Sequence, residues 1–155
     1  MTNESKKHKV LLDTKPLIKL FAKEEGWETI QEILLRIENG EIEAAISVVT
    51  LTEIYYKYLH EKRVDLAKAR VEELRYAASM KKLGIDERIA IKAGEFKGKY
   101  AVSIADAYIS ATAYYNDSIV LSDDADFEKI KEIRVQSEQE FLSAFNRFSP
   151  KNIKR

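Results

Sequence analysis

Short apolar runs alternate along the chain with longer segments in which apolar residues recur at helical spacing. Runs typical of strands occupy residues 9–12, 44–48, 81–85, 118–121 and 133–135. Helical spacing covers residues 16–21, 27–38, 50–59, 64–78, 86–97 and 103–115, followed by a short helix near Phe127 and a last helix through Phe141, Leu142 and Phe145. Strands that alternate with helices form βαβ units. The pattern therefore predicts an α/β domain with a parallel sheet covered on both faces.

Helix boundaries are marked by turn residues. Pro16 suits the first turn of a helix, and Asn39–Gly40 ends the second one. Thr50 is predicted to begin the helix after the second strand, and Gly98 to end the helix that starts at Asp86.

One domain accounts for residues 1–155, with residues 1–8 predicted as a flexible tail, which includes His8, and residues 149–155 as a basic tail after the last helix. The chain has no cysteine, which excludes disulfide scaffolds, thiolate zinc sites and cysteine nucleophiles. No apolar run approaches the roughly 20 residues of a membrane span. The N-terminal segment lacks the apolar core of a secretory signal. A cytoplasmic protein with no membrane contact is expected.

The segment 103–115 is predicted to form a buried helix around a single carboxylate. It is apolar on every side of a helical wheel, apart from Asp106, and a helix of that kind is typically buried. A buried carboxylate must be paired, hydrogen-bonded or bound to a metal, because an isolated buried charge is very unfavourable.

Four acids are predicted at one edge of the sheet, where ligands of open parallel sheets bind. Asp13 ends the first strand, Glu53 lies in the first turn of the helix after the second strand, Asp106 opens the buried helix, and Asp124 follows the strand 118–121. Carboxylates that converge repel one another unless a cation neutralises them. A set of carboxylates without His or Cys selects a hard ion, Mg²⁺ or Mn²⁺.

Helix capping is the alternative explanation for each acid. Thr50-x-x-Glu53 and Ser103-x-x-Asp106 match the capping box, and Asp13 and Asp124 could be simple N-caps. Ser137-x-x-Glu140 has the same pattern, and there we expect only a cap. The coincidence of four acids from four segments favours the metal site.

Neighbouring polar residues are expected to support the acids. Thr14 and Ser122 are placed to hydrogen-bond the carboxylates, and Asp126 is an auxiliary acid, whereas Asp123 is expected to be exposed.

Charge is balanced overall but unevenly distributed. The chain has 26 basic and 26 acidic residues, yet residues 57–99 have 12 Lys and Arg against 7 Asp and Glu, and residues 123–140 have 3 against 7. A basic flank beside an acidic centre suits an enzyme that attracts a polyanion to bound cations, although solvated helix faces would give the same pattern. Tyr55, Tyr56 and the helix 64–78 offer apolar surface that favours a homodimer.

The chain resembles the PIN-domain nucleases, most closely the VapC-like toxins of toxin–antitoxin pairs. Four motifs in order carry the resemblance: Val10–Thr14, Ile46–Glu53, Ile104–Ala113 and Val120–Phe127. It implies a three-layer α/β/α sandwich with a parallel sheet of four to five strands. It also implies Mg²⁺- or Mn²⁺-dependent endoribonuclease activity, a homodimer and a small inhibitory antitoxin partner.

The same resemblance implies that the metal and catalytic residues are Asp13, Glu53, Asp106 and Asp124. The chain departs from the family at Lys15, where a small hydroxyl residue is common. The predicted chemistry is metal-assisted hydrolysis of RNA phosphodiester bonds. Three alternatives stay open: a non-catalytic PIN scaffold that binds RNA or a partner protein, a PIN nuclease of RNA processing outside a toxin pair, and a phosphoryl-transfer fold of the receiver or dehalogenase type.

Overall fold

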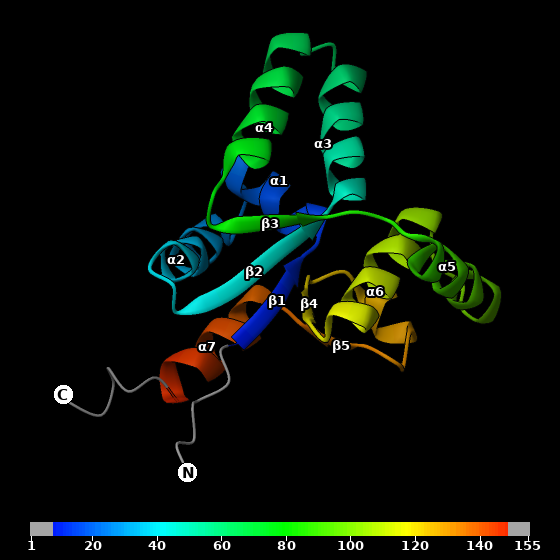
Figure 1. Cartoon of the computed structure of the whole chain (residues 1–155). Coiled ribbons are helices and arrows are strands. Elements are labelled where there is room, and N and C mark those ends of the chain that lie inside the picture. The colour runs from blue at the N-terminus through cyan, green and yellow to red at the C-terminus, as the bar shows by residue number, and fades with distance from the viewer. Residues whose placement is uncertain (1–7, 149–155) are drawn as a thin grey trace.

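The computed structural model describes residues 8–148 and has a five-stranded, fully parallel sheet at its centre (Figure 1). The strand order is β3-β2-β1-β4-β5. The strands are β1 (His8–Leu12), β2 (Ile42–Ser47), β3 (Met80–Leu83), β4 (Ile119–Leu121) and β5 (Arg134–Gln136). Because all the strands are parallel, their carboxyl ends lie at one edge, which is where sites form in such sheets.

Helices join every pair of strands that follow each other in sequence. They are α1 (Thr14–Ala22), α2 (Trp27–Glu38), α3 (Val48–His60), α4 (Val64–Tyr76), α5 (Glu87–Lys99), α6 (Ile104–Asn116) and the 3₁₀ helix η1 (Ala125–Lys129), and α7 (Glu138–Phe148) follows β5. The predicted fold class, an α/β/α sandwich around a parallel sheet, is confirmed. The predicted tails lie outside the described residues, apart from His8, and the extent of the single domain stays a prediction.

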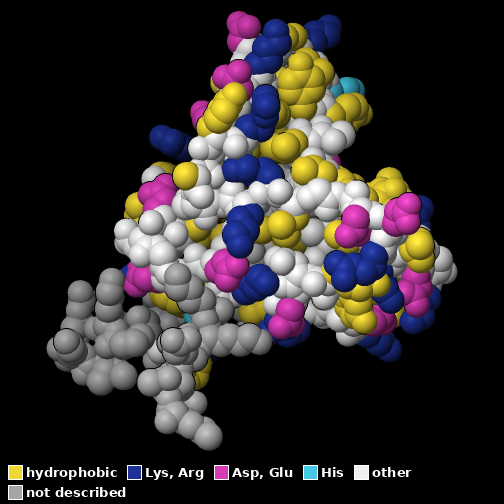
Figure 2. Space-filling view, viewed as in Figure 1, with side chains coloured by type: hydrophobic (Ala, Val, Ile, Leu, Met, Phe, Trp, Pro, Cys, Tyr) yellow, Lys and Arg dark blue, Asp and Glu magenta, His cyan; other side chains and the backbone are white. Residues whose placement is uncertain are grey.

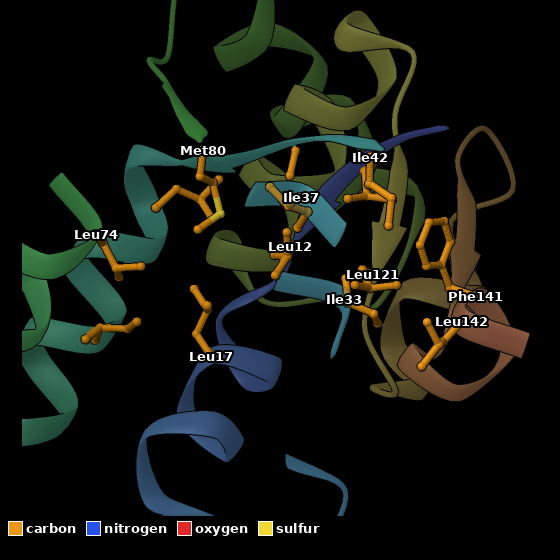
Figure 3. Close-up of a cluster of buried hydrophobic side chains, with 14 of the residues drawn as sticks. Leu12, Leu17, Ile33, Ile37, Ile42, Leu74, Met80, Leu121, Phe141 and Leu142 are labelled. Atoms are coloured by element: carbon orange, nitrogen blue, oxygen red, sulfur yellow. The ribbon is translucent and has the colours of Figure 1, made fainter. Parts of the chain in front are cut away.

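The two faces of the sheet bury alternate residues of β1. Val10 and Leu12 belong to a cluster that packs beneath α1, α2, α3 and α7, and Leu11 belongs to a cluster beneath α6 and η1. This alternation follows from the two-residue period of a strand. In Figure 3 the side chains of Leu12, Leu121 and Ile33 lie close together on the first face. The end of β1, which leads to Asp13, is therefore fixed by a packed core on both sides of the sheet.

Some predicted boundaries were wrong. Helix α3 begins at Val48 instead of Thr50, because Ser47 is its N-cap and accepts a hydrogen bond from the Val49 amide. Helix α5 continues through Gly98 to Lys99, because a glycine inside a helix is only about 1 kcal/mol less favourable than alanine. His8 is the first residue of β1, and its ring contacts Phe141 and Phe145 edge-on, so it is not part of a tail.

Helix α6 is buried along most but not all of its surface. The side chains of Ala107, Ile109 and Ala111 are fully buried, whereas Ile104 and Tyr114 at its two ends are exposed. Asp106 is only half-buried. The helical wheel, which is apolar on every side, therefore predicts more burial of the first turn of α6 than the structure has. Within residues 8–148, no helix is long and apolar enough to cross a membrane.

Removing the ring of Phe127 should destabilise the protein strongly. Phe127 is fully buried beneath β4 and α6, directly after the acidic loop. We expect Phe127→Ala to lower the free energy of unfolding by about 3–5 kcal/mol, as for other buried aromatic residues. Phe148→Ala, at a ring that is 77% exposed, is the control and should change it by less than about 0.5 kcal/mol. Urea denaturation of both variants measures the difference, and equal effects would contradict the assignment of Phe127 to the core.

Candidate metal centre

Strands β1 and β4 place two polar segments side by side at the carboxyl edge. Leu12 pairs with Leu121, and the Asp13 amide continues the ladder by donating to the Leu121 carbonyl at 3.2 Å. Asp13 and Ser122 come next on the two strands, so their side chains meet: the Ser122 hydroxyl donates to Asp13 Oδ2 at 2.8 Å. Both residues are almost fully buried.

The loop after β4 is held in shape by its own side chains. Ser122 Oγ also accepts from the Asp124 amide at 3.1 Å, and Asp124 Oδ1 accepts from the Asp126 amide at 3.0 Å. One serine hydroxyl therefore connects the acid of β1 with the acidic loop of β4.

Three carboxylates of this edge lie together. Asp106, Asp124 and Asp126 each offer an oxygen, and these three oxygens lie within 4.8 Å of one another. All three side chains are half-buried. Asp126, expected only as an auxiliary acid, thus belongs to the tightest group among the described residues. Asp124 and Asp126 lie two residues apart in one short loop. That spacing is the feature of the sequence that indicates their proximity.

Glu53 is positioned by a pair of threonines. The Thr14 hydroxyl donates to Glu53 Oε1 at 2.6 Å and lies 3.2 Å from Thr50 Oγ1. Thr14 and Ser122 thus contact carboxylates, as their sequence positions suggested. The sequence does not predict the contact between Thr14 and Thr50, because its pattern places Thr50 at the helix cap.

The acids differ in how far helix capping accounts for their positions. Glu53 lies in the second turn of α3, not the first, so it forms no capping box with Thr50. Asp13 occupies the N-cap position of α1 but makes no capping hydrogen bond with its side chain. Asp124 does cap η1, and the Ser103 hydroxyl accepts from the Asp106 amide.

The control pattern behaves as a cap. The Glu140 amide donates to Ser137 Oγ at 3.1 Å, and the Ser137 hydroxyl donates to Glu140 Oε1 at 3.0 Å. Ser137 therefore caps α7, and Glu140 bonds to the capping hydroxyl.

Burial and mutual repulsion raise the pKa of two of the acids. Burial raises the pKa of Asp13 to about 7, against the hydrogen bonds from Ser122 and the Thr14 amide, and the charges of Asp106 and Glu53 add to it. Burial also raises the pKa of Asp106 to about 6, with the charges of Asp124 and Glu53 next in size. The ionised forms of these side chains are therefore destabilised at neutral pH, and a nearby cation would relieve that.

A hard divalent cation fits this set of donors. Asp106, Asp124 and Asp126 supply carboxylate oxygens at a spacing that one ion can bridge, and Asp13 and Glu53 are close enough to act on Asp106 or on each other electrostatically. Oxygen ligands without nitrogen or sulfur are typical of Mg²⁺ and Mn²⁺ sites.

Lysines border the acidic group, and the sequence does not predict most of their contacts with the acids. Lys15 Nζ lies 3.2 Å from Asp123 Oδ1, and Lys19 also donates to Asp123. Lys129 Nζ lies 2.8 Å from Asp126 Oδ1. Only the i,i+3 spacing of Asp126 and Lys129 could have indicated such a contact. Asp123 is on the surface, as expected, but it is paired, which holds its pKa below the usual range despite partial burial.

The PIN domain family model matches residues 10–133. The chain therefore belongs to the PIN domain family, as the four motifs indicated. No curated protein matches the chain.

Solved structures of toxin–antitoxin complexes share the fold. DNA-bound VapBC from Salmonella typhimurium has a TM-score of 0.66 at 24% identity, covering 84% of this chain and 98% of that chain. VapBC2 from Rickettsia felis, bound to a DNA fragment from its promoter, has a TM-score of 0.68 at 15% identity, covering 83% and 98%. The fold is also shared by PAE2754 from Pyrobaculum aerophilum, with a TM-score of 0.61 at 16% identity, covering 90% of this chain and 96% of that chain.

Thermal stability should separate a metal ligand from a helix cap at Asp106. In EDTA at pH 8, Asp106→Asn should melt at the same temperature as the unchanged protein or higher, because it removes one of several repelling charges. With Mn²⁺ at a hundredfold excess over its dissociation constant, the unchanged protein should gain about 2.7 kcal/mol, and the variant should lose most of that gain. Thermal melts with EDTA and with Mn²⁺ measure both effects.

Glu140→Gln is the matched control, since it changes an acid in the same sequence pattern. It should lower stability by about 0.3–1 kcal/mol and leave the Mn²⁺ shift intact. The advantage of Asp106→Asn in EDTA should also disappear at low pH. A carboxyl pKa of about 6 in the folded state, above its ordinary value of 3.8, means that ionisation weakens the fold as pH rises through that window. A clearly destabilised variant with a full Mn²⁺ shift would exclude Asp106 as a ligand.

Proposed function

We propose that this protein is a Mg²⁺- or Mn²⁺-dependent endoribonuclease, and the toxin of a toxin–antitoxin pair. The observation that carries the proposal is the group of Asp106, Asp124 and Asp126, with Asp13 buried beside it. Membership of the PIN domain family supports nuclease chemistry, and the fold shared with VapBC complexes supports the toxin assignment.

In this proposal Asp106, Asp124 and Asp126 hold the cation, and Asp13 and Glu53 complete the site directly or through water. A divalent ion, when bound, polarises a phosphate oxygen and stabilises the charge that develops during hydrolysis. Such ligands must be ionised, so cation binding releases the protons that the raised pKa values of Asp13 and Asp106 retain near neutrality. Metal affinity should therefore rise with pH up to about 7.

The surrounding hydroxyls keep the carboxylates oriented. Ser122 fixes Asp13 and the Asp124 backbone, and Thr14 fixes one oxygen of Glu53. Groups that orient metal ligands in this way commonly change affinity or activity by 10–100-fold when they are removed. No neutral histidine lies in the site, so the proposed reaction uses no histidine as a general base.

The partners follow from the same proposal. RNA is the substrate, a small antitoxin protein is the inhibitor, and the protein acts in the cytoplasm. The second candidate function is a PIN nuclease of RNA processing outside a toxin pair, which uses the same acids. A small DNA-binding protein encoded directly upstream would favour the toxin assignment. The intact set of acids disfavours a non-catalytic scaffold, and Lys15 disfavours the receiver or dehalogenase type, which would require a second acid there.

Replacing one acid of the central group should abolish cleavage. Purified protein with Mn²⁺ or Mg²⁺ should cut single-stranded RNA, and EDTA should stop it. Asp124→Asn should lower kcat/KM by at least about 100-fold, because metal assistance contributes several kcal/mol to the barrier. Product analysis on denaturing gels measures the rate.

Glu140→Gln again serves as the control and should retain full activity. Cleavage that persists undiminished in EDTA would remove the metal from the mechanism. Cleavage that Asp124→Asn leaves unchanged would place the activity elsewhere, for example in a contaminating nuclease.

A homodimer is proposed through the projecting hairpin of α3 and α4. Tyr56, Leu59, Val64 and Tyr76 are exposed on these helices, at 66%, 38%, 47% and 74%. Figure 2 shows hydrophobic side chains gathered over this hairpin, which extends beyond the sheet in Figure 1. Exposed apolar groups that gather on one element commonly mark an interface.

Light scattering at micromolar concentration should give about twice the chain mass of 17.9 kDa. The double variant Tyr56→Ser, Tyr76→Ser should shift the protein towards monomer without lowering its melting temperature by the amount expected of a core change. Phe148→Ser removes an equally exposed ring from α7 and should leave the mass unchanged. A monomer in the unchanged protein would contradict the dimer.

A further inference from the structure

Two acids of the loop from Ser122 to Asp126 each form an ion pair with a lysine. Asp123 Oδ1 lies 3.2 Å from Lys15 Nζ, and Asp126 Oδ1 lies 2.8 Å from Lys129 Nζ. Asp124, between these two acids in sequence, lies with Asp106 in the central group. A strongly acidic centre therefore has a cation beside it from α1 and another from η1.

Lys15 is held loosely enough to exchange its partner. Its side chain is 51% exposed, and it follows Asp13 and Thr14 directly on α1. Asp123 is also bound by Lys19, whose side chain is only 16% exposed. Asp123 would therefore stay paired if Lys15 moved away. The bond to Asp123 raises the pKa of Lys15, and the charges of Asp124 and Asp13 also contribute, so the ammonium lies within electrostatic reach of the metal-binding acids.

Lys129 also borders the acids, through Asp126. Its side chain is 47% exposed, and its ammonium also donates to the Ala101 carbonyl at 3.2 Å, in the segment that leads to α6 and Asp106. Its partner Asp126 is one of the three acids that one cation can bridge. A cation bound at Asp126 would repel the Lys129 ammonium, which would favour its exchange to another anion.

We propose that Lys15 and Lys129 bind phosphates of a single-stranded nucleic acid near the bond that is cut. The inference rests on the proposed nuclease function, because the acids define where that bond lies. A polyanion that approaches the five carboxylates is repelled, and one bound divalent cation offsets only part of their negative charge. Lysine binds phosphate as a point charge. Exposed ion pairs contribute little to stability, so exchanging a carboxylate for a phosphate is easy.

The test is the salt dependence of cleavage by single-lysine variants. For the unchanged protein, log(kcat/KM) on a short single-stranded RNA should fall linearly with log[KCl] at fixed Mg²⁺. Lys15→Gln and Lys129→Gln should each make that slope shallower by about 0.7, which is the contribution of one phosphate contact to a single strand. KM should rise several-fold, and kcat should stay within about twofold, since only binding is lost.

The controls separate charge from structure. Lys15→Arg and Lys129→Arg keep the charge and should keep the slope of the unchanged protein. Lys81→Gln removes an exposed lysine of β3, which is paired with Glu43 of β2, and should leave slope and KM unchanged, because β3 is an edge strand separated from β1 by β2. Thermal melts check that the glutamine variants are folded.

Two results would overturn the inference. Slopes equal to that of the unchanged protein would show that neither lysine contacts a phosphate. A fall in kcat with no change in KM or slope would show that the lysines only position the acids. If the unchanged protein does not cut RNA, the proposed function fails by itself. The lysines are then tested through the salt slope of the dissociation constant for the same RNA, measured by fluorescence anisotropy in Mg²⁺.

Discussion

Repulsion among carboxylates is the constraint that shapes the carboxyl edge of the sheet. Asp13 is buried, and the charges of its neighbours add to the burial that raises its pKa to about 7. The fold offsets part of this repulsion with hydrogen-bond donors: the Ser122 hydroxyl and the Thr14 amide on Asp13, and the Asp126 amide on Asp124. The acids also lie at the starts of helices α1, α6 and η1, where the helix dipole favours negative charge. These donors hold the carboxylates in place but leave enough repulsion for a cation to remove.

Packing on both faces of the sheet holds this edge in place. Leu11 and Leu12 are buried on opposite faces of the sheet, so the end of β1 cannot shift without disturbing two cores. Phe127 does the same for the loop after β4, since it is buried directly beyond Asp126. A site whose charges repel one another needs such support, because the acids would otherwise move apart and lose the spacing that an ion requires.

Much of the fold could be predicted from hydrophobic periodicity, since buried parallel strands and amphipathic helices have strong patterns. The edge positions of Asp13 and Asp124 followed from the topology alone. Boundaries were less certain where two signals competed. At Ser47 and Thr50 either residue could cap a helix, and the choice depended on where β2 stops hydrogen-bonding to its neighbours. That choice changed the interpretation of Glu53, which a helix starting at Thr50 would have made a capping residue.

The side-chain contacts around the acids could not be predicted from the sequence. The bond between Thr14 and Glu53 joins residues 39 positions apart, and the ion pair between Lys19 and Asp123 joins residues 104 apart. No local pattern encodes such contacts. They arise because parallel strands bring the starts of several helices to one edge, where oppositely charged side chains then find one another. Asp123 and Asp126 illustrate the result: they differ little in sequence context, yet one pairs with α1 while the other joins the group that can bind a cation. The same short loop therefore carries acids that can hold an ion and acids that pair with lysines. That combination suits the proposed nuclease site, which has to accept a cation and a polyanion together.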